Sequence, residues 1–202
     1  MLFIIIRFVF WSLFLVICCY LIKKSHVIRK RKWLLIAFVT IVLLITASAL
    51  IPVENIFVTF PSPESAYNYN NSGDVKLVVD GEKTDFIVGL KGDTTVYTIV
   101  PKSEGGWKLG MALNTKRVFQ MIYDGIIIYV YQYQHSDDYY VTVLDTNGGK
   151  LEITDNRDSK FQYMEQENSV LNESFYTYYT YIKGFDDQYT LTVNDKVIRA
   201  HN

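Results

Sequence analysis

Two long apolar runs, residues 2–22 and 33–53, open the chain, and the segment between them is polar and basic. Each run is long enough to cross the roughly 30 Å apolar core of a bilayer as an α-helix, which takes about 20 residues. In lipid, a helix satisfies the hydrogen bonds of its own backbone. The hydropathy pattern therefore predicts an anchor of two transmembrane helices within residues 1–53.

The segment between the two runs, residues 23–32, reads KKSHVIRKRK and contains six Lys or Arg residues. Short loops rich in Lys and Arg stay on the cytoplasmic side of a membrane. We therefore expect a cytoplasmic loop at 23–32 and an extracytoplasmic domain at 54–202, attached to the lipid bilayer of a cell membrane. A nucleic-acid partner needs a basic face on a folded domain, and we expect none from so short a loop.

The second apolar run also allows another interpretation. Basic residues precede it, and Ala47-Ser48-Ala49 near its end resembles the small-residue cleavage site of a secretory signal. Cleavage after Ala49 would release a secreted β protein. The preceding apolar run and the uncharged length of 33–53 favour a retained anchor.

Beyond residue 60 the pattern of hydrophobic positions changes twice. Ser62 is a suitable N-cap, Pro63 suits the first helical position and Glu64 suits the first turn, so a short helix is expected to end before Gly73. After Gly73, apolar and polar residues alternate, as is typical of half-buried strands.

Two-residue turn signals recur between these alternating runs. Asp-Gly and Asn-Gly accept the positive φ angles of the type I′ turn, which joins the strands of a hairpin. We predict about ten strands, mostly antiparallel and joined to their sequence neighbours. A subdomain boundary near 110–114 and one continuous core are both compatible with the sequence. The turn signals are Asp80-Gly81, Asp124-Gly125, Asn147-Gly148 and the weaker Asn194-Asp195.

Charge is divided unevenly along the chain. The first 50 residues contain no Asp or Glu, whereas residues 51–202 contain 13 basic and 21 acidic residues, a net charge of −8. No cysteine follows Cys19, so an exported domain would be stable without disulfides, as about 150 residues allow. This composition suits a bacterial envelope protein.

The motifs of common catalytic and metal sites are absent from the sequence. Residues 54–202 contain two histidines, His135 and His201, no cysteine, no G-x-S-x-G and no H-E-x-x-H. The run from Asp145 departs from a calcium loop, with Lys150 and Asn156 at the sixth and twelfth positions. We therefore predict no enzyme, cofactor or metal site. Hydrolysis of an envelope glycan, which needs only two carboxylates, is the weaker alternative.

Tyrosine supplies the candidate binding residues. Tyr129, Tyr131 and Tyr133 would share one face of a strand, because side chains alternate between the two faces. Such a row would bind sugar rings or another envelope protein, although tyrosine is also a good strand former that packs well when half buried. Both faces of the run from Ile126 are apolar at its start, and we expect at least one of them to be buried. The sequence thus predicts an anchored, extracytoplasmic, mainly β binding module.

Overall fold

The computed structural model describes residues 9–14, 16–18, 20, 38–40, 42, 52–111, 114–134, 136–168 and 173–199. The chain divides into two compact units, residues 1–59 and 60–202. The second unit is mainly antiparallel β-sheet, as the sequence predicts.

In the first unit, the described residues between 9 and 20 and between 38 and 42 are helical, and a 3-10 helix, η1, spans Val53–Ile56. In the part of the chain that the structure describes, no helix combines the length and apolar character needed to cross a membrane. Most of the expected spans 2–22 and 33–53 lies outside the described residues. The basic loop 23–32 and Ala49 lie outside them entirely.

Helix α3, Pro63–Asn70, opens the second unit and begins where the sequence predicts. The hydroxyl of Ser62 accepts a hydrogen bond from the backbone N–H of Ser65, and the Ser65 side chain accepts one from the N–H of Ser62. This reciprocal pair satisfies two backbone donors that the first helical turn leaves free. The helix packs through Ala66 and Tyr67, both 1% exposed.

A four-stranded antiparallel sheet follows, with the order β1-β2-β3-β4. The pairing of Asp80 with Asp85 shows that the β1–β2 connection is longer than the two-residue turn predicted at Asp80-Gly81. The backbone of Phe60, just before α3, pairs with Trp107 of β4. The strands are β1 (Asp74–Asp80), β2 (Thr84–Lys91), β3 (Thr94–Ser103) and β4 (Gly106–Trp107).

A five-stranded antiparallel sheet has the order β5-β6-β7-β10-β9. The chain passes into it between Trp107 and Thr115, the interval in which the sequence allows a subdomain boundary. Asp124 and Gly125, with φ angles of 49° and 78°, form the two-residue turn predicted between β5 and β6. The strands are β5 (Thr115–Tyr123), β6 (Ile126–Tyr133), β7 (Asp138–Asp145), β9 (Gln162–Asn168) and β10 (Glu173–Lys183).

A three-stranded sheet of order β12-β11-β8 completes the unit; its strands are β8 (Ile153–Asp155), β11 (Thr190–Val193) and β12 (Lys196–Arg199). The two-residue turn at Asn194-Asp195 is confirmed, with φ angles of 46° and 65°. The prediction of a hairpin at Asn147-Gly148 is wrong. The turn follows β7, but the next strand, β8, pairs with β11 in a different sheet.

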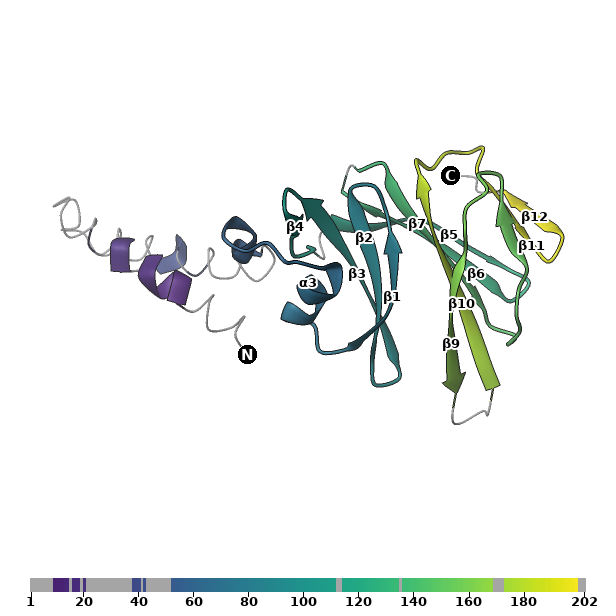
Figure 1. Cartoon of the computed structure of the whole chain (residues 1–202), viewed down its shortest axis with the longest axis horizontal. Helices are drawn as coiled ribbons and strands as arrows, with labels where there is room; N and C mark the ends of the chain where they lie inside the picture. Colours follow the sequence, from purple (N-terminus) through teal and green to yellow (C-terminus); the bar gives the residue numbers. More distant parts are fainter. Residues whose placement is uncertain are drawn as a thin grey trace. The chain divides into compact units, whose positions relative to one another are not determined.

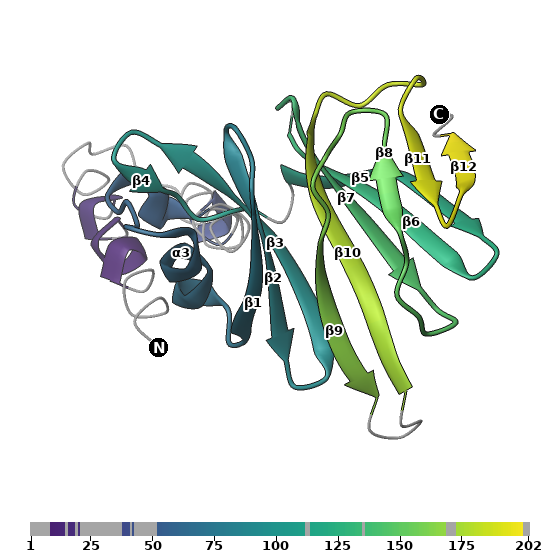
Figure 2. The same cartoon turned by 45° about the vertical axis from the view of Figure 1, so that its right-hand side comes forward.

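The five-stranded sheet is buried on both faces. One face packs on the four-stranded sheet through a core that includes Phe86 and Tyr140, and the other packs on the three-stranded sheet through a core that includes Val130 and Leu191. Figures 1 and 2 show β10 between the strands of these two outer sheets. Ile126, Ile128 and Val130 are all less than 9% exposed, which confirms that one side of β6 is buried.

Candidate functional site

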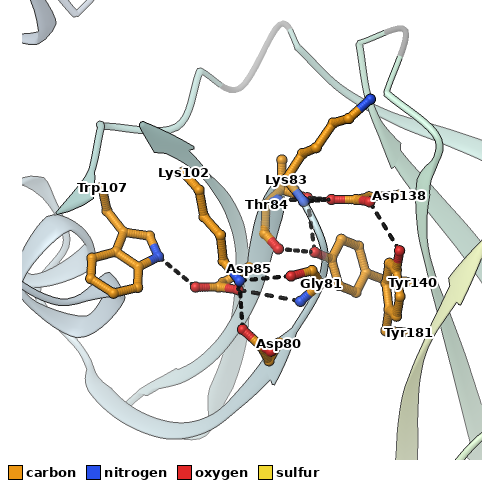
Figure 3. Close-up of polar contacts among 10 residues, drawn as sticks. All are labelled: Asp80, Gly81, Lys83, Thr84, Asp85, Lys102, Trp107, Asp138, Tyr140 and Tyr181. Atoms are coloured by element: carbon orange, nitrogen blue, oxygen red, sulfur yellow. Dashed lines mark hydrogen bonds and ion pairs between the residues drawn. The ribbon is translucent and has the colours of Figure 1, made fainter. Parts of the chain in front are cut away.

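A network of buried polar groups joins the start of β2 to the start of β7 (Figure 3). Asp138, 1% exposed, accepts hydrogen bonds at Oδ2 from the backbone N–H groups of Lys83 and Thr84, both at 2.7 Å, and from the Thr84 hydroxyl at 2.9 Å. The hydroxyl of Tyr181 donates to Oδ1 at 3.2 Å. Four donors therefore compensate the cost of burying this carboxylate.

Tyr140 extends the same network. Its hydroxyl donates to the carbonyl oxygen of Thr84 at 2.6 Å and lies 2.8 Å from Thr84 Oγ1. Burial raises the pKa of Tyr140 well above its ordinary value, although the bond to Thr84 opposes the shift. The phenol is therefore neutral and serves as a fixed donor, which favours a structural role between the two sheets.

Asp85 is the second buried carboxylate of the network (Figure 3). It accepts hydrogen bonds from the indole N–H of Trp107 at 2.5 Å and from the backbone N–H of Gly81 at 3.3 Å, and Lys102 Nζ lies 3.0 Å from its Oδ1. Lys102 also donates to Asp80 Oδ1 at 2.6 Å. Burial raises the pKa of Asp85, and the bonds from Lys102 and Trp107 oppose that shift.

The network has the geometry of a junction between sheets. Asp85 and Asp138 are each saturated by donors from the protein itself, so their oxygen atoms are occupied by intramolecular contacts. Among the residues that the structure describes, no group of three or more His, Cys, Asp or Glu side chains is arranged to hold a metal ion.

The three tyrosines singled out from the sequence lie on β6, on the face directed toward the four-stranded sheet. Tyr133 is 8% exposed and belongs to the core between the sheets, Tyr131 packs against that core, and Tyr129 is half-buried. Tyr133 is therefore buried, whereas Tyr129 and Tyr131 are both partly exposed. They do not form a uniformly exposed row.

Phe86 of β2 lies at the centre of the aromatic packing around these tyrosines. The Phe86 ring, 0% exposed, stacks on Tyr131 at 5.7 Å, on Tyr140 at 5.2 Å and on Tyr97 of β3 at 5.5 Å between ring centroids. Tyr97 is 36% exposed and lies 6.0 Å from Tyr131. Tyr97 could not be identified from the sequence, because the alternation of side chains along β3 does not show that Tyr97 contacts Tyr131 of β6.

Arg117 of β5 adds a positive charge to this group. Its guanidinium carbon lies 5.2 Å from the centroid of the Tyr129 ring, within the range of a cation–π contact. Burial, with the neighbouring phenols of Tyr97 and Tyr129, raises the pKa of Tyr131 to about 12, and Arg117 opposes this shift. We call Tyr97, Arg117, Tyr129 and Tyr131 the tyrosine ledge.

A second group of tyrosines lies on the opposite face of the five-stranded sheet. Lys150 Nζ lies 5.4 Å from the ring centroid of Tyr163 and 5.6 Å from that of Tyr176. The Tyr176 hydroxyl donates to Glu165 at 2.8 Å. Here the lysine already occupies the space above both rings and a carboxylate lies close by.

Comparisons with protein-family models, with curated proteins and with solved structures find no match to this chain. The tyrosine ledge is therefore interpreted from its own geometry and charge.

Proposed function

We propose that the protein is a membrane-anchored binding module of the bacterial cell envelope. Its anchor consists of spans 2–22 and 33–53 with the loop 23–32 in the cytoplasm, and residues 54–202 form the extracytoplasmic domain. The observation that carries the proposal is the six-charge loop between two apolar runs, in a segment without acidic residues. The partner is a cell-wall glycan or another envelope protein.

The tyrosine ledge supports binding as the activity of the extracytoplasmic domain. It combines a partly exposed Tyr97, a half-buried Tyr129 and an exposed Arg117, and tyrosine and arginine are enriched where proteins bind partners. The buried ring of Phe86 stacks on Tyr97 and Tyr131 and holds these two rings in place. A surface supported in this way loses little side-chain freedom on binding.

Release of the domain is the second candidate, favoured by the sequence Ala47-Ser48-Ala49 directly after the apolar core of the second run. In this version a peptidase cleaves after Ala49, and the β domain acts as a secreted binding protein. The tyrosine ledge would be the binding surface of both the anchored and the released protein. The two versions differ in the N-terminus of the mature protein.

Reporter fusions test the topology. A reporter that works only outside the cytoplasm should be active when fused after Asn202 and inactive when inserted at Val27, in the basic loop. Cytoplasmic activity of a fusion after Asn202 would refute the proposal. Mass spectrometry of the N-terminus separates anchored from released protein: an intact chain confined to membranes excludes release, and a chain beginning at Leu50 in the medium demonstrates it.

A further inference from the structure

Arg117 and its neighbour Lys116 lie on the edge strand β5, with their side chains on opposite faces of the sheet, and Arg117 lies on the face of the ledge. Among the described residues, neither forms an ion pair with a carboxylate, and both side chains are exposed. By contrast, an acidic partner lies within 4.0 Å of each of Lys76, Lys83, Lys102, Arg157, Lys183 and Lys196. In a segment with a net charge of −8, Arg117 is therefore a local positive charge beside the rings of the ledge.

The position of Arg117 keeps its charge uncompensated. β5 is the outer strand of its sheet, and the residues opposite Lys116 and Arg117 on β6 are Gln132 and Tyr131. Neither of these neighbours is acidic. A guanidinium binds a carboxylate or phosphate through two parallel hydrogen bonds, so Arg117 is complementary to an anionic ligand.

The aromatic rings of the ledge indicate which kind of molecule bears the anionic group. The rings of Tyr129 and Tyr131 lie 6.0 Å apart, and Tyr97 adds a third ring from the neighbouring sheet. Each ring has an apolar face and a polar hydroxyl. The exposed amide of Gln120, opposite Tyr129, adds both a donor and an acceptor. Flat apolar faces bordered by hydroxyl and amide groups match a sugar ring, which has apolar C–H faces and a rim of hydroxyls.

We propose that the tyrosine ledge binds a saccharide that bears a carboxylate or phosphate group. Arg117 holds the oxyanion, and the rings of Tyr97 and Tyr129 face the sugar. This inference rests on the proposed function, because an envelope glycan meets the ledge only if residues 54–202 lie outside the cytoplasm.

The test uses the full-length chain in detergent micelles and measures binding to immobilised polymers. Polygalacturonate presents carboxylates on sugars, poly(glycerol phosphate) substituted with glucose presents phosphates, dextran is the neutral saccharide, and poly-L-glutamate is an acidic peptide. We expect binding to at least one of the two anionic saccharides, with a Kd that rises with salt because exposed charges are screened. Binding to dextran and poly-L-glutamate should be at least about tenfold weaker.

Substitutions then locate the site. Arg117→Gln should weaken saccharide binding about tenfold, because it removes a charge-assisted hydrogen bond, and Arg117→Lys should restore part of the affinity. Tyr129→Leu should weaken binding and retain its salt dependence. Lys150→Gln is the matched control, since it removes another exposed cation that contacts tyrosines, and it should change the Kd by less than about twofold. Arg117 is exposed, so its variants should fold; circular dichroism checks this.

Three results would overturn the inference. These are the absence of binding to both anionic saccharides, equal binding by folded Arg117→Gln, and binding to poly-L-glutamate as tight as to the saccharides, which would point to an acidic protein segment instead. The reporter fusions keep the two proposals apart. A domain shown to lie outside the cytoplasm that fails to bind these polymers overturns the saccharide inference alone.

Discussion

The carboxylate of Asp138 accepts a hydrogen bond of 2.7 Å from the backbone N–H of Thr84, and this contact joins two different sheets. Thr84 begins β2 of the four-stranded sheet, and Asp138 begins β7 of the five-stranded sheet. A side chain thus satisfies backbone donors at the point where the chain turns out of β1 and into β2.

We expect Asp138→Ala to lower the free energy of unfolding by about 2 to 4 kcal/mol. The substitution leaves the buried N–H of Thr84 and the hydroxyl of Tyr181 without their acceptor, and unsatisfied buried donors are costly. Urea unfolding followed by circular dichroism measures the change. The control is Asp137→Ala next to it, whose side chain is 71% exposed and which should have little effect. Equal losses for the two variants would contradict the role assigned to Asp138.

Trp107→Phe should lower stability by about 1 to 3 kcal/mol, because it removes the indole donor from a buried carboxylate while keeping an aromatic ring. The double variant with Asp85→Asn should lose less than the sum of the two single losses, since neutralising Asp85 reduces its need for that donor. Thermal unfolding of all four proteins gives the coupling energy. Strict additivity would show that the bond between Trp107 and Asp85 contributes nothing.

Stability should fall at alkaline pH. The pKa of Tyr131 is raised to about 12 in the fold, whereas an unfolded tyrosine titrates near about 10. The unfolded chain therefore releases its proton first, so the stability from a neutral Tyr131 is complete below about pH 10 and is lost as the pH rises toward 12.

Tyr131→Phe isolates this contribution. The variant should lose less stability than the parent protein between about pH 10 and 11, and its tyrosinate absorbance should lack one late-titrating group. Tyr163→Phe is the control, because Tyr163 is 52% exposed. If the late-titrating part of the absorbance curve is unchanged in Tyr131→Phe, then Tyr131 ionises elsewhere in the pH range.

Gly89→Ala should destabilise the domain by about 1 to 3 kcal/mol. A Cβ atom at Gly89 would collide with the hydroxyl and ring of Tyr67 on α3, which is 1% exposed. In the described part of the chain, the Tyr67 hydroxyl has no hydrogen-bond partner, so Tyr67→Phe alone should be neutral or stabilising. The double variant should recover part of the loss, as a double-mutant cycle in urea would show.

Local signals in the sequence predicted the elements whose formation depends on neighbouring residues. Ser62 caps α3, and Asp124-Gly125 closes the β5–β6 turn, because backbone geometry over a few residues decides both. The same turn chemistry at Asn147-Gly148 suggested a hairpin that does not form. A turn fixes a change of direction, but the strand that pairs with β8 comes much later in the chain.

The candidate site depends even more than the fold on contacts between residues that are distant in the sequence. The alternation of side chains correctly placed Tyr129, Tyr131 and Tyr133 on one face of β6, but burial of Tyr133 follows from the packing of a second sheet. Tyr97 comes from β3 and Arg117 from β5, and they contact Tyr131 and Tyr129 through sheet packing and strand pairing. No short sequence motif predicts contacts of this kind.

Strand β8 pairs with a strand that comes much later in the chain. This affects the order in which the layers of the second unit can form. Among the described residues, β8 pairs with β11 alone, and one apolar face of the middle sheet is covered by Leu191, Val193 and Ile198 from the last two strands. Until those strands have emerged, that face has only part of its apolar cover, including Leu151 and Ile153, and the third layer cannot close. If the chain is exported behind an N-terminal anchor, as we propose, this face of the middle sheet would therefore be fully covered only as the final residues leave the translocation channel.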